Sequence, residues 1–376
     1  MKKILIVNNN LDMGGIQTSL INLLWEIHNA YDITLLLFSK SGALLKAVPE
    51  NVKVISPCKC YSVLGLTKEE LKKYPLLFLI KAFLLKYASV FSRRSAMKLL
   101  GVFQKRIKGY DSVISYSHLT NHKYFTNGCA DFVLDKTVSN NKICLIHCDY
   151  FNSGSMTDKN NAQYAAFDRI ACCSDSVKER FLQGSAMDRS KVYTLRNFFD
   201  ATIEKKAADC PYIYDDSYIN LVSVARVSAE KGIDRAITAL ANSKRTDIRY
   251  YVIGDGPKRN DLVSKVNAYG LKDQVFFLGV QENPYRYMVN ADYLLVPSVH
   301  EAAPMVFDEA KILGLPVLTT NTTSAMEMVG TEHGRVFDNS QEGIVSVLSE
   351  LSKGVSKKRL PRTNELQREQ FVKLIY

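Results

Sequence analysis

Short apolar runs alternate with helical patterns along the whole chain. The first run, residues 4–7, is followed by a segment of helical periodicity at 16–27. Such alternation is typical of a parallel α/β sheet, because parallel strands need a crossover connection that is usually a helix. The same pattern predicts further strands in the first half of the chain at 33–38, 52–55, 112–116, 142–146, 169–173 and 192–195.

The alternation lapses at residues 197–218, which we interpret as a linker, and then starts again. The second half has predicted strands at 219–224, 248–253, 275–278, 293–296 and 317–320, and predicted helices near 233–242, 258–269 and 305–313. A last amphipathic helix is predicted at 364–376. We therefore expect two doubly wound, Rossmann-like domains at 1–200 and 201–360, with 361–376 packing back on the first. Such sheets bind ligands beyond the carboxyl ends of their strands.

Composition agrees with a two-domain globular protein, but the charge is unevenly placed. The chain has 376 residues, 47% of them hydrophobic and 23% charged, and a formal net charge of +11. Residues 68–108 hold eleven basic and two acidic residues, a net +9. The rest of the chain is nearly neutral, which argues against a general nucleic-acid binder.

The basic segment also contains apolar pieces, at 76–80, 82–85 and 97–103. None approaches the roughly 18 residues that a membrane-spanning helix needs. Basic and apolar residues mixed in this way favour a helix lying on an anionic membrane surface, with Lys81, Lys86, Arg93 and Arg94 toward the lipid. The alternative is a pair of amphipathic core helices with solvated lysines.

The cysteines and the first residues bear on the compartment. None of the eight cysteines forms a CxxC pair, and the apolar stretch after Met1 is too short for a signal peptide. We therefore expect a cytoplasmic protein with reduced thiols, and the basic segment adds the expectation of peripheral attachment to the cytoplasmic face of the inner membrane. No metal-ligand cluster stands out, and Asp215-Asp216 lies in the linker. We expect no cofactor and no metal.

Three groups of residues are candidates for binding chemistry. Gly14-Gly15 precede a predicted helix, whose amino terminus attracts anions, although an ordinary turn would have the same pattern. Arg226 and Lys231 flank a strand–helix junction and could clamp a diphosphate. The alternative for them is a pair of solvated loop cations.

The third group is a pair of glutamates around a helix start. Glu301 lies in a loop after a strand, Pro304 suits the first turn of the next helix, and Glu309 lies inside that helix. Helical spacing allows both carboxylates to point into one cleft, where they could accept sugar or ribose hydroxyls. The alternative is a helix-start glutamate favoured by the dipole and a solvated Glu309.

The order and spacing of these motifs resemble glycosyltransferase family 4, a large retaining family with the GT-B fold. The resemblance spans both predicted domains and is densest from 221 to 334. It rests on Gly14-Gly15, Ser174, Arg196-Asn197 with Asp200, Arg226 with Glu230-Lys231-Gly232, Gly254-Asp255-Gly256-Pro257, Phe277-Leu278-Gly279, Pro297-Ser298, Glu301 through Glu309, Gly314-Leu315-Pro316-Val317 and Glu327. The sequence departs from the family at Ala302 and Ala225, where glycine is common.

The resemblance implies a GT-B protein with an interdomain cleft and a role for each motif. Glu309 would hold the donor ribose, Glu301 would face the donor sugar, and Arg226 and Lys231 would clamp the diphosphate. His147 would line the sugar site, unless it is a lone core or surface histidine. The remaining implied substrate-binding residues are Gly14, Gly15, Gly254, Gly256, Pro304, Met305 and Val306.

The resemblance further implies a retaining hexosyltransferase that needs no metal. Its donor would be a nucleotide-diphosphate sugar, most simply a UDP-sugar, and its acceptor a glycan or a lipid-linked glycan. Family habit indicates bacterial surface polysaccharide, capsule or lipopolysaccharide as the product. Two alternatives stay open: a GT-B nucleotide-sugar epimerase, and a non-catalytic partner subunit of a glycosyltransferase.

Overall fold

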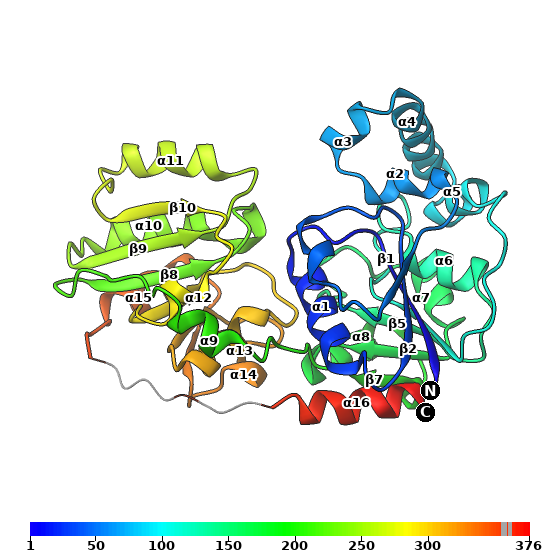
Figure 1. Cartoon of the computed structure of the whole chain (residues 1–376). Coiled ribbons are helices and arrows are strands. Elements are labelled where there is room, and N and C mark those ends of the chain that lie inside the picture. Colours follow the sequence, from blue (N-terminus) through cyan, green and yellow to red (C-terminus); the bar gives the residue numbers. More distant parts are fainter. Residues whose placement is uncertain (355–358, 360–362) are drawn as a thin grey trace. The chain divides into compact units, whose positions relative to one another are not determined.

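In a computed structural model, the chain forms two compact units, each a parallel sheet covered by helices (Figure 1). The structure describes residues 1–354, 359 and 363–376. Unit 1 comprises Met1–Phe198 and Asn364–Tyr376, and unit 2 comprises Phe199–Thr363. The expected boundary between 360 and 361 lies outside the described residues.

The sheet of unit 1 has seven strands in the order β3-β2-β1-β4-β5-β6-β7, and all its strand pairs are parallel. Its strands are β1 (Lys3–Asn8), β2 (Asp32–Leu37), β3 (Lys53–Ile55), β4 (Ser112–Ser115), β5 (Lys142–Ile146), β6 (Arg169–Cys172) and β7 (Val192–Thr194). Its helices are α1 (Gly15–Ile27), η1 (Ala43–Ala47), η2 (Lys59–Tyr61), α2 (Ser62–Gly65), α3 (Lys68–Lys72), α4 (Pro75–Val90), α5 (Arg93–Leu100), α6 (Cys129–Lys136), α7 (Asp158–Tyr164), α8 (Asp175–Ser185), η3 (Arg189–Lys191) and α16 (Glu365–Ile375).

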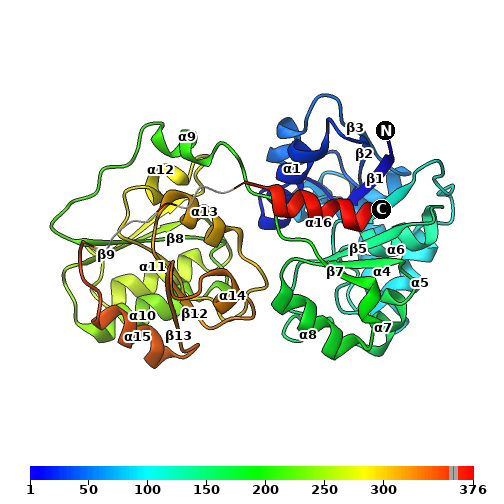
Figure 2. The same cartoon turned by 90° about the horizontal axis from the view of Figure 1, so that it is seen from below.

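Side-chain alternation in the strands divides the core of unit 1 between the two faces of the sheet. Successive strand residues point to opposite faces, so Ile4 and Ile6 of β1 join one cluster of buried residues. Helices α1 and α16 pack on this face, and α16 contributes Phe371 and Leu374 to the cluster. The last helix of the chain therefore belongs to the first sheet, beside α1 (Figure 2).

The sheet of unit 2 has six parallel strands in the order β10-β9-β8-β11-β12-β13. Its strands are β8 (Ile219–Val224), β9 (Ile248–Ile253), β10 (Val275–Gly279), β11 (Tyr293–Val296), β12 (Val317–Thr320) and β13 (Gly334–Phe337). Its helices are α9 (Ile203–Ala208), η4 (Ala229–Lys231), α10 (Ile233–Ser243), α11 (Arg259–Ala268), α12 (Tyr285–Met288), α13 (Met305–Leu313), α14 (Ala325–Met328) and α15 (Gln341–Ser349).

Two apolar clusters cover the two faces of this second sheet. In β8, Leu221 belongs to the cluster under α10, α11 and α15, whereas Val222 belongs to the cluster under α9, α12 and α13. Two doubly wound α/β units, as predicted from the sequence, are thus confirmed. The prediction missed β13 and α15, as well as α9, which lies inside the expected linker.

Residues 68–108 form α3, α4, α5 and the chain after them. The lysines do not interrupt α4, which runs unbroken for 16 residues and begins with Pro75 at its first position. No helix among the described residues is long and apolar enough to cross a membrane. The segment therefore contains one continuous, largely apolar helix instead of the short separate pieces that the sequence indicated.

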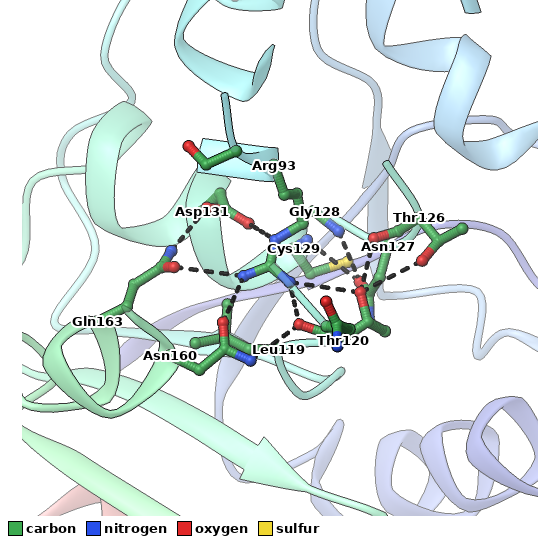
Figure 3. Close-up of polar contacts among 12 residues, drawn as sticks. Arg93, Leu119, Thr120, Thr126, Asn127, Gly128, Cys129, Asp131, Asn160 and Gln163 are labelled. Carbon is green, nitrogen blue, oxygen red and sulfur yellow. Dashed lines mark hydrogen bonds and ion pairs between the residues drawn. The ribbon is translucent and has the colours of Figure 1, made fainter. Parts of the chain in front are cut away.

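The expectation that Arg93 faces a lipid surface is wrong. Its side chain is buried, and its Nε donates a 2.9 Å hydrogen bond to Asp131, itself buried in α6 (Figure 3). Nη2 donates to side-chain oxygens of Asn160 and Gln163, and Nη1 donates to the Thr120 carbonyl. A buried guanidinium with these partners joins α5 to α6, to α7 and to the loop after β4, so it is not available to a lipid surface.

Candidate active site

The order of strands in unit 2 creates a point where the chain reverses its direction of winding. From β8 the chain continues to β9 and β10 on one side, and later to β11, β12 and β13 on the other. β8 and β11 are neighbours in the sheet, so the loops that follow them leave its carboxyl edge side by side. Ligands of doubly wound sheets bind at such a switch point.

The backbone fastens these two loops to each other. Gly232 follows η4 with a φ of +65°, and a Cβ there would lie 2.0 Å from the Pro297 carbonyl oxygen. The Val299 amide donates a 2.9 Å hydrogen bond to the Glu230 carbonyl. Only glycine allows both this left-handed conformation and this approach, so the two loops have a fixed relation.

Two of the predicted catalytic residues meet across the loops. Lys231 Nζ donates a 2.6 Å hydrogen bond to Glu301 Oε1, and Ser298 Oγ donates to the same oxygen at 2.9 Å. The side chains are 26% and 10% exposed, respectively. A charge-assisted contact this short, partly shielded from water, is one of the stronger polar interactions in a protein.

Arg226 is exposed and lies on the same loop, between β8 and η4. Burial alone would raise the pKa of Glu230, but the hydrogen bond from Ser228 and the charges of Lys231 and Arg226 lower it. The loop after β8 therefore presents two cations at the switch point, one exposed and one already paired with Glu301.

Glu309 lies in a different set of contacts. It is buried in α13, and the Tyr285 hydroxyl of α12 donates a 3.3 Å hydrogen bond to its Oε1. Burial raises the pKa of Glu309 to about 7, the Tyr285 hydrogen bond lowers it, and the charge of Asp200 raises it. The contacts of Glu301 are with Lys231 and Ser298, so the described hydrogen bonds keep the two glutamates in separate networks.

Pro304 directly precedes α13 in extended conformation instead of occupying its first position. Met305 and Val306 begin the helix and are half-buried. Ala302, where the family commonly has glycine, is buried. The helix that carries Glu309 thus starts three residues after this alanine, at the edge of the switch point.

Gly254 and Gly256 have a packing role in the structure. A Cβ at Gly254 would lie 2.0 Å from the Ala225 carbonyl oxygen, and one at Gly256 would lie 2.3 Å from that of Val227. The Val227 amide donates to the Asp255 carbonyl at 3.0 Å. These glycines therefore let the loop after β9 lie against the loop after β8.

In unit 1, Gly14 and Gly15 lie at the amino terminus of α1, as the sequence predicted. Gly14 caps the helix without a side-chain hydrogen bond, and its first turn has no acidic residue. No atom lies within 4 Å of a Cβ built at Gly15, and both glycines are exposed. The space beside the Gly15 backbone is therefore open.

His147 follows β5 at the carboxyl edge of the first sheet. Its ring packs against Tyr116 at a centroid distance of 5.1 Å, and its Nε2 is buried without a hydrogen-bond partner among the described residues. Burial and the neighbouring His118 lower the pKa of His147 to about 3. The imidazole is thus neutral at physiological pH.

His118 and Tyr285 were not predicted as site residues. His118 follows β4, next to β5 in the sheet, and burial and the charge of Arg93 lower its pKa to about 4. Its position in the loop at the carboxyl end of a strand was a signal that could have identified it. Tyr285 lies in a helix of four residues, too short for hydrophobic periodicity to show.

Two features bear on metal and redox chemistry. Among the described residues, no group of three or more His, Cys, Asp or Glu side chains is arranged to hold a metal ion. All eight cysteines are free.

The sequence of this chain is similar to those of known glycosyltransferases. Residues 213–362, which lie in unit 2, match the family model of glycosyl transferases group 1. The gpi3 subunit of phosphatidylinositol N-acetylglucosaminyltransferase from Schizosaccharomyces pombe is 25% identical over 230 residues, 59% of this chain and 50% of that one. The O-antigen biosynthesis glycosyltransferase WclY from Escherichia coli is 35% identical over 106 residues, 28% of this chain and 30% of that one. The chain thus spans half or less of the length of these curated relatives.

A solved structure extends the likeness to both units. Anabaena Alr3699/HepE in complex with UDP-glucose superposes with a TM-score of 0.62 at 17% identity, covering 93% of this chain and 89% of that one. At this identity the likeness concerns the fold alone, and the fold is GT-B.

Proposed function

We propose that this chain is a retaining hexosyltransferase of glycosyltransferase family 4, which transfers a sugar from a nucleotide-diphosphate donor to a glycan or lipid-linked acceptor. The observation that supports this most is the Lys231–Glu301 ion pair across the switch point of unit 2, with Arg226 exposed on the same loop. This is where a doubly wound sheet binds a nucleotide, and the residues supply both cations and an anion.

In this proposal, unit 2 binds the donor. Arg226 and Lys231 neutralise the charge that builds on the leaving diphosphate. Glu301 faces the sugar and stabilises positive charge at the anomeric carbon, and Glu309 accepts the ribose hydroxyls. The acceptor attacks from the face that the leaving group departs from, and the diphosphate takes the acceptor proton. UDP is the proposed nucleotide, and the UDP-glucose bound to HepE supports this choice.

Unit 1 then binds the acceptor, near the amino terminus of α1 and the neutral His147. The name of WclY supports a surface polysaccharide such as O-antigen as the product. We also propose that the chain acts at an anionic membrane surface, where a lipid-linked acceptor would be found. No bound metal is needed in this scheme, so EDTA is expected to leave turnover unchanged.

A thermal-shift screen against nucleotide sugars, followed by a transfer assay, tests the proposal. A ligand at 100 times its Kd adds about 2.7 kcal/mol to the stability of its binding unit. UDP-sugars are expected to raise the melting temperature more than other nucleotide sugars do. The transfer product with retained anomeric configuration is the decisive result. Interconversion of the nucleotide sugar without an acceptor would show an epimerase, and binding without either reaction would show a non-catalytic subunit.

A further inference from the structure

Helix α4 exposes an unusual row of apolar side chains. Of its 16 residues, only Leu84 and Ala88 are buried. On another side of the helix, Leu76, Leu79, Phe83 and Val90 are 71%, 65%, 58% and 69% exposed. Spacings of three, four and seven residues bring these four side chains and Lys86 onto one line along the helix. We call this set, Leu76, Leu79, Phe83, Lys86 and Val90, the α4 ridge.

A ridge of this kind needs an apolar partner. Single exposed apolar residues are ordinary on a protein surface, but a contiguous set marks an interaction site. A helix that is apolar on nearly all sides is normally found in a core or in contact with lipid. Phe78 and Leu85, on the flank of the ridge, are also exposed. The α4 ridge therefore needs a partner that the rest of unit 1 does not supply.

The charges of residues 68–108 indicate what kind of partner covers the α4 ridge. α4 contains Lys81 and Lys86 and no acidic residue. The two acids of the segment are engaged locally, Glu69 with Lys72 at 3.0 Å and Glu70 in the cap of α3. Exposed cations elsewhere in the segment are Lys73, Lys98, Lys105, Arg106 and Lys108. A second copy of this chain would bring the same positive charge to the contact, whereas an anionic lipid surface offers both acyl chains and negative headgroups.

We propose that α4 lies in the plane of an anionic lipid monolayer, with the apolar side chains of the α4 ridge between acyl chains and Lys86 among the headgroups. Sixteen residues of helix are about 24 Å long, which suits a helix lying in the interface. This inference names the surface behind the membrane attachment proposed above, and it rests on that part of the proposed function alone.

The chain just after α4 is fastened to the rest of unit 1 by a buried side chain. Arg93 begins α5 three residues after α4 ends, and its buried guanidinium is fixed by Asp131 (Figure 3). The same side chain holds the Thr120 carbonyl in the loop after β4, two residues beyond His118. A docked α4 would therefore hold the carboxyl edge of the first sheet at a set distance from the lipid, where a lipid-linked acceptor could reach it.

A single tryptophan placed on the α4 ridge tests insertion directly. The only tryptophan of the chain is Trp25, so the variant Trp25→Phe with Phe83→Trp reports from the ridge alone. Its emission is expected to shift to the blue with vesicles of phosphatidylcholine and phosphatidylglycerol, and to stay unshifted with phosphatidylcholine alone. The matched control is Trp25→Phe with Ile213→Trp, a position in unit 2 that is also exposed. The proposal is overturned if the ridge variant shows no shift at low salt, or if the control shifts equally.

Co-sedimentation with the same vesicles gives the energetic test. Leu79→Ser with Phe83→Ser is expected to weaken binding about tenfold or more, because the inserted apolar area is lost. The matched control is Leu366→Ser with Val372→Ser, two exposed apolar side chains of α16 in the same unit. Equal binding by both double variants would overturn the proposal. So would a dimer in sedimentation velocity that Leu79→Ser with Phe83→Ser dissociates, if no tryptophan shift accompanies it, since a second copy would then cover α4.

UDP binding separates this inference from the proposed reaction. Calorimetry on the Leu79→Ser, Phe83→Ser variant is expected to give the wild-type UDP affinity, because α4 belongs to unit 1 and the proposed donor residues belong to unit 2. If the wild-type protein bound vesicles but not UDP, the donor proposal would be refuted and the lipid-surface proposal would be unaffected. UDP binding and transfer to a soluble acceptor, without vesicle binding, would refute the lipid surface only.

Discussion

Lys231 Nζ lies 2.6 Å from Glu301 Oε1, so two residues for which the family resemblance implies separate roles form one ion pair. Lys231 comes from the loop after β8 and Glu301 from the loop after β11. A diphosphate bound by Lys231 would compete with Glu301 for the ammonium group. Donor binding would then free the Glu301 carboxylate to face the sugar, and the two proposed roles would depend on each other.

This coupling predicts non-additive losses of turnover. Lys231→Met and Glu301→Gln are each expected to reduce kcat about 10²–10³-fold, the usual cost of one electrostatic group in a transition state. The double variant is expected to lose little more than either single variant, since residues that act as a unit are not additive. Turnover at saturating donor measures the cycle. Losses that multiply would mean independent roles.

A paired lysine in the same unit is the control for that cycle. Lys258 forms an ion pair with Asp261 at 3.0 Å near the start of α11, and both side chains are well exposed. Lys258→Met removes the same charge from unit 2 without touching the proposed diphosphate clamp. It is expected to keep wild-type turnover, and a comparable loss there would mean that net charge alone explains the effect.

Arg226 tests the clamp without disturbing an ion pair. The side chain is exposed, so Arg226→Ala is expected to change stability by no more than about 0.5 kcal/mol. Turnover is nevertheless expected to fall about 10²–10³-fold. Lys272→Ala, which removes an exposed cation just before β10 at the opposite edge of the sheet, is expected to have no effect. Full activity of Arg226→Ala with saturating donor would rule out a clamp role.

Glu309 predicts a pH dependence of nucleotide binding. Burial raises its pKa from 4.5 to about 7, so the free protein holds a proton on this carboxyl at pH 6 and has largely lost it at pH 8. A carboxylate that accepts ribose hydroxyls must be ionised, so UDP affinity is expected to rise about tenfold from pH 6 to pH 8. Calorimetry should show proton release on binding at pH 6.

Glu309→Gln is the control, because UDP itself titrates in the same range. The UDP affinity of this variant is expected to be lower, and to change with pH only because UDP itself titrates. Folding stability changes with pH in the opposite direction to UDP affinity. Because the pKa of Glu309 is raised in the folded protein, its contribution to stability is fully present below pH 4.5 and is lost as the pH rises through about 7. The variant should therefore gain stability relative to wild type between pH 5 and pH 8. Parallel pH profiles for both proteins would exclude ionisation of Glu309 from binding.

The sequence predicted the strands well because buried parallel strands are continuous apolar runs. The run at 4–7 became β1, and the pattern at 305–313 matched α13. The strand β13, at the edge of the sheet, was not predicted because Gly334 and Arg335 interrupt its apolar pattern. Local periodicity identifies an element only where one face or both faces are consistently apolar.

Partner choice in the site could not be predicted in the same way. The sequence predicted that Lys231 and Glu301 each follow a strand, but their ion pair depends on the close approach of the two loops at Gly232, a tertiary feature. Arg93 shows the same limit. Among the basic residues of 68–108 nothing local marks it as buried, since its partners lie 27 to 70 residues farther along the chain.

Buried Arg93 gives the last prediction, on the stability of unit 1. Arg93→Met leaves the Asp131 carboxylate buried without its cation, and breaking a buried pair in this way costs about 3–5 kcal/mol. Arg94→Met is the matched control: its pair with Asp135 is 3.4 Å long and its side chain is 39% exposed, so we expect a loss below about 1 kcal/mol. Urea unfolding followed by Trp25 fluorescence measures both, because this tryptophan lies in α1 and reports on unit 1.

Replacing the partner as well, in Arg93→Met with Asp131→Leu, should recover part of the lost stability, since no unpaired charge then stays buried. Equal losses for Arg93→Met and Arg94→Met would show that the network in Figure 3 contributes no more than a surface pair.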